Sequence, residues 1–242
     1  AYEIRNCDWS SDVYSSDLTG GFLDSFLVGY HDLFGFPDQG RDVYPKNQFG
    51  VFADYQGQTV FAQRENAFAL ADIPVSLAWQ VLEPKRDTLG LALRAGLELP
   101  TGDRDDGFGN GKLDTALGAV VEYPLAWGTF YGTLQHTFVG NPDRAAQASF
   151  AFADVTSAGL GLELPLYEDL AVLVQTEWET STLRDLGFDY VSSSQWLLWT
   201  GGRLRLERNL CFEVTMAEDL AGFVSPDVTF WFAMAWLPGR KV

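Results

Sequence analysis

Single charged residues recur among small and apolar residues from position 94 onward. Nine lie on the polar side of predicted strands: Arg94, Glu98, Glu122, Glu163, Glu177, Glu179, Arg203, Arg205 and Glu213. Alternate side chains of a strand point to opposite faces, so we expect these nine inside a barrel. There they could form a constriction that selects permeating molecules, or a network that neutralises its own charges and fills a narrow interior.

The spacing also predicts one cross-strand ion pair. If a turn at residues 207–209 pairs Leu206 with Leu210, Arg203 lies directly opposite Glu213. Opposite charges at such positions contribute about 0.2–1 kcal/mol to a sheet.

Oxygen-bearing side chains gather between glycines at Asp103, Asp105, Asp106 and Asn110. These oxygens could bind calcium, but the segment lacks the spacing and the closing glutamate of an EF-hand. A solvated turn is the preferred interpretation, and we predict no metal site. The chain has two histidines, and its two cysteines, Cys7 and Cys211, form no CxxC pair. These ligands are too few for a typical zinc site. A disulfide between the two cysteines is a possibility that the sequence leaves open.

The sequence also shows no group of residues arranged for catalysis. His136 falls on the outward face of its strand, and the preferred interpretation is an imidazole near a membrane interface. A lipid hydrolase would need a serine beside it, and no adjacent serine is evident. The glycines of residues 107–111 precede a strand and not a helix, unlike a phosphate-binding loop. We therefore expect no enzymatic activity and no cofactor.

The elements that would position these residues are strands. From Leu89 to Leu99 the odd positions are leucine or alanine, whereas the even positions are glycine, alanine, arginine or glutamate. The same alternation recurs at residues 159–164, 170–179 and 203–206. Glycine has little reason to recur on a solvated face, but a crowded barrel interior needs small residues. We therefore expect the aliphatic rows to face lipid and the polar rows to face the lumen.

Connections of alternating length support this interpretation. We predict eleven strands, at about 48–55, 58–64, 75–83, 88–99, 113–123, 128–139, 157–165, 170–180, 195–206, 210–218 and 228–237. Short turns at 83–87, 124–127, 165–169 and 207–209 alternate with long loops at 100–112, 140–156, 181–194 and 219–227. Short periplasmic turns and long extracellular loops are typical of outer-membrane barrels. Such barrels usually have an even strand number, so we expect about twelve strands.

Aromatic residues fall at the predicted strand ends. At the short-turn end these are Tyr123, Trp127 and Trp236, and at the long-loop end they are Phe138, Trp178 and Trp196. Amphipathic rings concentrate at both interfaces of a bilayer, which favours two aromatic belts.

Composition excludes other classes. The 242 residues carry a net charge of −17, which disfavours a nucleic-acid partner, and 47% of them are hydrophobic, which is far from a disordered chain. The longest stretch without charge, from Tyr123 to Pro142, is broken by prolines and glycines, so no transmembrane helix is expected.

The N-terminal region departs from the strand pattern. Residues 8–18 closely resemble a translated DNA-sequencing adapter, differing only at Tyr14, so we interpret residues 1–18 as non-native and residues 19–242 as one barrel domain. A native surface segment rich in serine and aspartate is the alternative. Apolar residues at helical spacing over 22–34 indicate a short helix at the barrel rim, or else one strand.

Two short motifs carry a family resemblance. Residues 99–103 read Leu-Pro-Thr-Gly-Asp, and Gly109, Gly111 and Asp114 open the next strand. This resembles a group of bacterial outer-membrane barrels that includes the MetA-like proteins of phenol-degradation clusters, and residues 34–41 resemble an N-terminal feature of one uncharacterised branch. The resemblance implies an outer-membrane location and passive transport, and it brings no catalytic residues.

The sequence thus predicts an all-β protein, an antiparallel transmembrane barrel in the bacterial outer membrane. Outer-membrane lipid and a small-molecule permeant are the expected partners, while a protein partner and the oligomeric state stay open. The leading hypothesis is a narrow passive channel or uptake route. The alternatives are a structural or partner-binding barrel with a closed lumen and, less favoured, a soluble ligand-binding barrel whose aliphatic rows would point inward.

Overall fold

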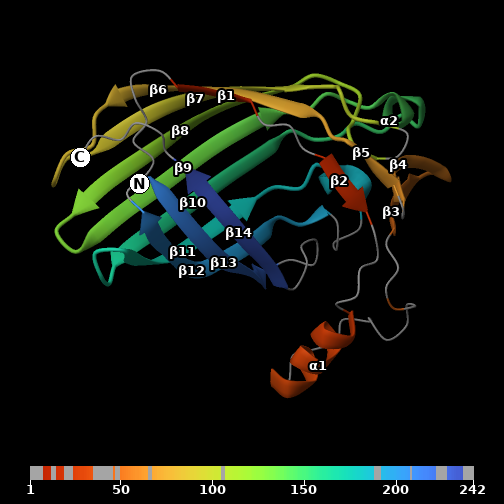
Figure 1. The fold of residues 1–242 in the computed structure, drawn as a ribbon. Helices are drawn as coiled ribbons and strands as arrows, with labels where there is room; N and C mark the ends of the chain where they lie inside the picture. The colour runs from red at the N-terminus through yellow and green to blue at the C-terminus, as the bar shows by residue number, and fades with distance from the viewer. Residues whose placement is uncertain are drawn as a thin grey trace.

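The computed structural model describes residues 8–11, 15–18, 24–34, 46, 50–64, 67–104, 107–187, 192–207, 209–221 and 228–236. Ten strands form one antiparallel sheet in the order β1-β6-β7-β8-β9-β10-β11-β12-β13-β14 (Figure 1). Their bounds are β1 Asp8–Ser11, β6 Ile73–Leu82, β7 Gly90–Leu99, β8 Asp114–Leu125, β9 Gly128–Phe138, β10 Val155–Pro165, β11 Leu170–Glu179, β12 Gln195–Glu207, β13 Leu210–Ala221 and β14 Val228–Trp236. No described helix is long and apolar enough to cross a membrane.

From β6 to β14 each strand pairs with the next strand of the chain. These nine strands lie within three residues of the bounds predicted from alternation, so the up-and-down order is confirmed. The connections also alternate as predicted: only residues 126–127 separate β8 from β9, whereas residues 139–154 separate β9 from β10. The short turns therefore lie at one end of the sheet and the long loops at the other.

The sheet curves around a hollow but does not close among the described residues (Figure 1). β14 pairs with β13 alone, and β1 pairs with only the four residues Val75–Ala78 of β6. The described strands therefore form an open, curved sheet, and neither a closed barrel nor the expected total of about twelve strands is confirmed.

The predicted strands at 48–55 and 58–64 do not belong to the main sheet. β3 (Gly50–Tyr55) and β4 (Gln58–Arg64) form a separate hairpin, and a further small sheet joins β2 (Ser15–Leu18) to β5 (Ala67–Leu70). The assignment of the hairpin to the barrel wall was wrong because its apolar side has another partner. Buried Val60 of β4 packs with Ala145, Ala148 and Phe150 of the loop after β9.

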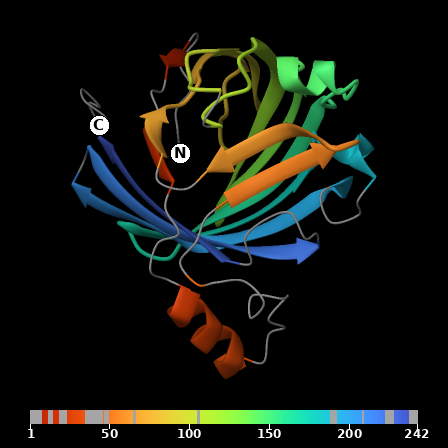
Figure 2. The ribbon, with the colours of Figure 1, turned by 90° about the vertical axis from the view of Figure 1, so that its right-hand side faces the viewer.

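That loop contains helix α2 (Asp143–Gln147), which contacts β4. Tyr55, Phe152, Leu183 and Leu186 complete the small apolar cluster, so parts of two long loops and the hairpin pack together. We call this assembly the cap. Figure 2 looks onto the long-loop end and shows the hairpin crossing in front of the curved sheet.

The aliphatic rows face outward, as predicted. Leu93, Leu117, Leu134 and Leu160 lie on four neighbouring strands and are 43%, 60%, 58% and 55% exposed. No large side chain of the described residues is fully buried, and seven of the ten buried hydrophobic residues are alanines. The described part of the sheet therefore has no conventional apolar core, and many of its large apolar side chains are exposed.

Helix α1 spans Asp24–Phe34, which confirms the helical alternative for this segment. Figures 1 and 2 show it apart from the main sheet, so the predicted packing at the barrel rim is not observed. The short strands β1 and β2 fall within residues 1–18, whose non-native origin stays a prediction that the source sequencing reads would test.

Candidate ligand-binding lumen

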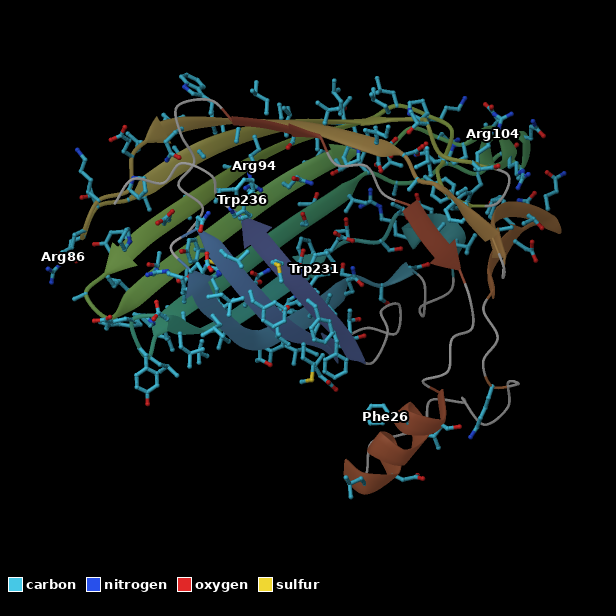
Figure 3. All side chains as sticks on the ribbon, in the orientation of Figure 1. Phe26, Arg86, Arg94, Arg104, Trp231 and Trp236 are labelled. Atoms are coloured by element: carbon cyan, nitrogen blue, oxygen red, sulfur yellow. The ribbon has the colours of Figure 1, made fainter. Side chains whose placement is uncertain are left out.

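A cavity of about 540 Å³ lies on the concave side of the main sheet. Six of the nine predicted lumen charges line it: Arg94, Glu122, Glu163, Glu177, Arg203 and Glu213. They come from six different strands, and the pleat brings them together because each lies opposite the aliphatic row of its strand. Figure 3 shows Arg94 and Trp231 between the ends of the sheet marked by Arg86 and Arg104.

Arg203 is the centre of the best-defined charge network in this cavity. It is the register partner of Glu213, as predicted, although Leu210 pairs with Glu207 and not with Leu206, because the register shifts between Arg205 and Glu207. Its Nε and Nη2 donate to Glu213 Oε2 at 3.1 and 3.0 Å, and its Nη1 donates to Glu163 Oε2 at 2.7 Å. The three side chains are between 19% and 27% exposed, so water screens these ion pairs only partly.

Aromatic side chains share the cavity with these charges. The Tyr131 hydroxyl donates to Glu163 Oε2 at 3.4 Å, and Trp199 Nε1 donates to Glu177 Oε2 at 3.2 Å. Trp231 of β14 also lines the cavity. The interior is therefore a mixed surface of carboxylates, guanidinium groups and rings.

Sequence reasoning did not predict Trp199 and Trp231 as lumen residues. Their positions in the sequence could have indicated this. Trp199 lies four residues before Arg203 and therefore on the same face of β12, and Trp231 lies between Phe230 and Phe232 and therefore on the opposite face of β14 from those two rings. An alternation that treats every aromatic residue as apolar overlooks rings on the polar face.

Two glycines on the polar side of β10 and β12 have different surroundings. A Cβ on Gly161 would make only ordinary contacts, the nearest at 3.7 Å from Gln175 and Tyr131. A Cβ on Gly201 would lie 2.1 Å from the Val214 carbonyl oxygen, so only glycine allows β12 and β13 to approach at this point.

The other three predicted lumen charges lie outside this cavity. Glu98 is the register partner of Asp114 at the long-loop end of β7. Glu179, at the same end of β11, accepts a hydrogen bond from Gln195 at 3.2 Å. Arg205 lies near the short-turn end, 54% exposed and 4.0 Å from Asp169.

The predicted aromatic residues lie at the ends of their strands. Trp127 and Trp236 at the short-turn end are 59% and 64% exposed, and Tyr123 donates to the Asp87 carbonyl oxygen at 3.3 Å. At the long-loop end Phe138 is 47% exposed, and Trp178 is the register partner of Trp196. Tyr167, 75% exposed at the short-turn end, extends the set that the sequence predicted.

In the acidic loop after β7 the described groups bind one another. Asn110 Nδ2 donates to both carboxylate oxygens of Asp114, and Gly140 N donates to Asp114 Oδ1 at 2.7 Å. Buried Asp72 accepts from Gly102 N at 2.7 Å. Asp103 lies in the same loop, whereas Asp105 and Asp106 lie outside the described residues. Within the described part of the chain, no cluster of metal-ligating side chains is found. Asn110 thus orders the loop.

His136 has neighbours that the sequence did not reveal. Its Nδ1 lies 2.9 Å from Thr156 Oγ1, and its Nε2 lies 3.8 Å from Asp154 Oδ2. The second separation exceeds hydrogen-bond range, so this threonine, histidine and aspartate do not form the continuous relay of a hydrolase. Cys211 is a free thiol, and its possible partner Cys7 lies outside the described residues.

A second cavity, of about 820 Å³, lies between the cap and the loop after β7. Asp143 at its edge accepts a hydrogen bond from Lys112 Nζ at 2.6 Å and pairs with Arg104 Nη1 at 3.2 Å. The hydrogen bond from Lys112 and the two cationic charges lower the pKa of Asp143 below its usual value. The two cavities have no lining residue in common.

One protein family matches almost the whole chain. Residues 5–236 match the family described as "Protein of unknown function (DUF3187)". The chain belongs to the DUF3187 family. No curated protein matches the chain. The resemblance to the MetA-like proteins is not confirmed by this match and stays a prediction.

Among solved structures, the chain of this DUF3187 member is similar to the toluene transporter TodX of P. putida. The TM-score is 0.37 and the sequence identity is 11%, over 89% of this chain. The match covers 60% of TodX, so the chain spans less than two thirds of that protein.

Proposed function

We propose that this DUF3187 protein is a barrel of the bacterial outer membrane that gives small molecules a narrow passive route through its lumen. The observation that carries the proposal is the opposite character of the two faces of one sheet. Leucines that are about half exposed cover the convex face, while charged and aromatic groups line a cavity on the concave face. Lipid would solvate the first face, and a permeant would contact the second.

Strand length supports a membrane setting. The nine strands from β6 to β14 have between 9 and 13 residues. A tilted strand of about 9–11 residues crosses the hydrocarbon core of a bilayer. Exposed Trp127 and Trp236 at one end and Phe138 and Trp196 at the other would then lie at the two interfaces.

The closed-lumen barrel is the second candidate, and the cap is the observation that favours it. Val60 and Phe150 are 2% and 4% exposed, so the hairpin is packed firmly against the loops at the long-loop end. A cap that stays in place would leave the lumen as a binding site without a through-route. A soluble ligand-binding barrel would instead need the leucine rows inside, opposite to their observed direction.

Reconstitution separates these functions. The full chain, folded in detergent, is expected to migrate differently on gels before and after boiling and to conduct ions in planar bilayers. Absence of current above background at every voltage, from protein that shows the mobility shift, would overturn the channel and leave the closed barrel. Solubility without detergent and an unchanged mobility would overturn the membrane barrel itself. We propose no enzymatic activity and no cofactor.

A further inference from the structure

The charges of the lumen cavity do not balance. Four carboxylates and two guanidinium groups line it. Arg203 is shared by Glu163 and Glu213, each within 3.0 Å, so this network keeps a net negative charge. A cavity with excess negative charge raises the local concentration of cations over that of anions.

Glu177 is the carboxylate available to a cationic ligand. It forms no ion pair with any arginine or lysine that the structure describes. Glu177 accepts a hydrogen bond from the neutral indole of Trp199 at 3.2 Å, which holds the carboxylate and the ring side by side. A carboxylate accepts further donors at its free lone pairs, so this pairing leaves Glu177 able to bind an ammonium group.

Rings supply the second half of a cation site. Tyr131, Trp199 and Trp231 line the same cavity from β9, β12 and β14. The face of an aromatic ring attracts a cation, and tryptophan does so most strongly. A quaternary ammonium group, which cannot donate hydrogen bonds, depends on such faces together with a nearby negative charge.

Size also fits a small organic molecule. The cavity volume of about 540 Å³ falls within the range of about 300–1,000 Å³ that is usual for ligand pockets. From the cavity, its excess of carboxylates and its rings we infer that the lumen binds small organic cations, ammonium compounds that carry an apolar body. This inference deepens the proposed function. The passage of such cations through the lumen rests on the proposed function, whereas their binding in the cavity does not.

Binding is tested on the folded full chain in detergent with benzyltrimethylammonium, and benzenesulfonate serves as an anion of similar size. Calorimetry is expected to detect the cation and not the anion. Glu177→Gln keeps the side-chain volume and an acceptor for Trp199 but removes the charge, and we expect about tenfold weaker binding of the cation. Trp199→Phe should weaken it to a smaller extent. Glu168→Gln, in the exposed turn after β10, is the matched control and should change nothing.

The outcomes separate this inference from the channel. Equal binding of cation and anion, or unchanged binding by a Glu177→Gln variant that shows the normal mobility shift, would overturn the organic-cation site even if the barrel conducts. Selective binding without conductance would support the site and overturn the channel. In a conducting barrel, block of the current by benzyltrimethylammonium and not by benzenesulfonate would support both.

Discussion

At the scale of single residues, Arg203 has the largest structural role in the lumen. It binds two carboxylates that would otherwise repel each other in a partly buried setting, at 2.7 and 3.0 Å. Removal of one member of such a network leaves partly buried charges without a partner of opposite charge. This lowers the free energy of unfolding more than the loss of an ion pair on the surface does.

Arg203→Met is therefore expected to lower the free energy of unfolding by about 1–3 kcal/mol, because Glu163 and Glu213 lose their charged donor. Urea unfolding in lipid vesicles measures this change. Arg205→Met is the control, since Arg205 is 54% exposed and 4.0 Å from Asp169, and it should have an effect within about 0.5 kcal/mol. Equal effects of the two substitutions would contradict the role of Arg203.

Asp143 gives a pH dependence at the long-loop end. Its pKa is lowered in the folded protein by Lys112 first and by Arg104 as well. A carboxyl with a lowered pKa contributes stability above its unfolded pKa, and this contribution is lost as the pH falls through the lower folded pKa. We expect the carbon NMR titration of Asp143 to have its midpoint below about 3.9, and Lys112→Met to raise the midpoint. An unchanged midpoint in that variant would refute the pairing.

At the scale of elements, the strands of the main sheet have an exposed apolar face, which the proposed function assigns to lipid, and an opposite face that carries the charged residues. In β9, Leu134 points outward and is 58% exposed, while the neighbouring Gln135 points to the other face. In a soluble protein, an exposed leucine can be replaced by lysine at little cost. In a bilayer the same change exposes a charge to hydrocarbon.

Leu134→Lys is thus expected to destabilise the folded protein in vesicles by about 2–4 kcal/mol, and Gln135→Lys by much less. Unfolding in lipid vesicles compares the two variants on adjacent residues of one strand. A Leu134→Lys variant as stable as the original protein would mean that this face does not contact hydrocarbon.

The cap is a separate element-scale unit, held by a few apolar side chains. Phe150 is 4% exposed, and its ring centroid lies 5.1 Å from that of Tyr55 in the hairpin. Phe150→Ala removes this contact and is expected to destabilise the cap by about 3–5 kcal/mol while the sheet stays folded. Hydrogen exchange should become faster at residues 50–64 and stay slow in β9. Equally fast exchange in both would show that the cap and the sheet unfold together.

At the scale of the whole molecule, the free edges of the sheet matter most. Among the strands that the structure describes, β14 has one partner, and most of β6 has one as well. Unpaired backbone groups in hydrocarbon are costly, by several kcal/mol each, so a membrane barrel has to join its edges. Trp231 on the edge strand β14 and Arg94 on β7, the strand next to β6, line one cavity, so the two sides of the sheet face a common interior.

In lipid vesicles, the backbone amides of β14 are therefore expected to exchange as slowly as those of β9. Slow exchange at residues 228–236 would indicate a closing partner on the second side of this strand. Fast exchange at alternate residues of β14, beside a protected β9, would contradict closure of the barrel.

Much of the architecture was predictable from the sequence because alternation is local. A period of two, with leucine on one side and glycine or charge on the other, located β6 to β14 and the direction of their faces. The turn predicted at residues 207–209 also placed Arg203 opposite Glu213, although an irregularity next to the turn changes the partner of Leu210. Neither result needs knowledge of distant segments.

Only the tertiary structure decided which strands belong together. The strands β3 and β4 alternate as barrel strands do, yet Val60 is buried against Phe150, about ninety residues further along the chain, and the hairpin joins the cap. Trp199, Trp231 and Glu177 likewise line one cavity only because the sheet curves and brings their strands around the same space. Faces follow from the period of a single strand, whereas partners follow from contacts between residues far apart in the chain.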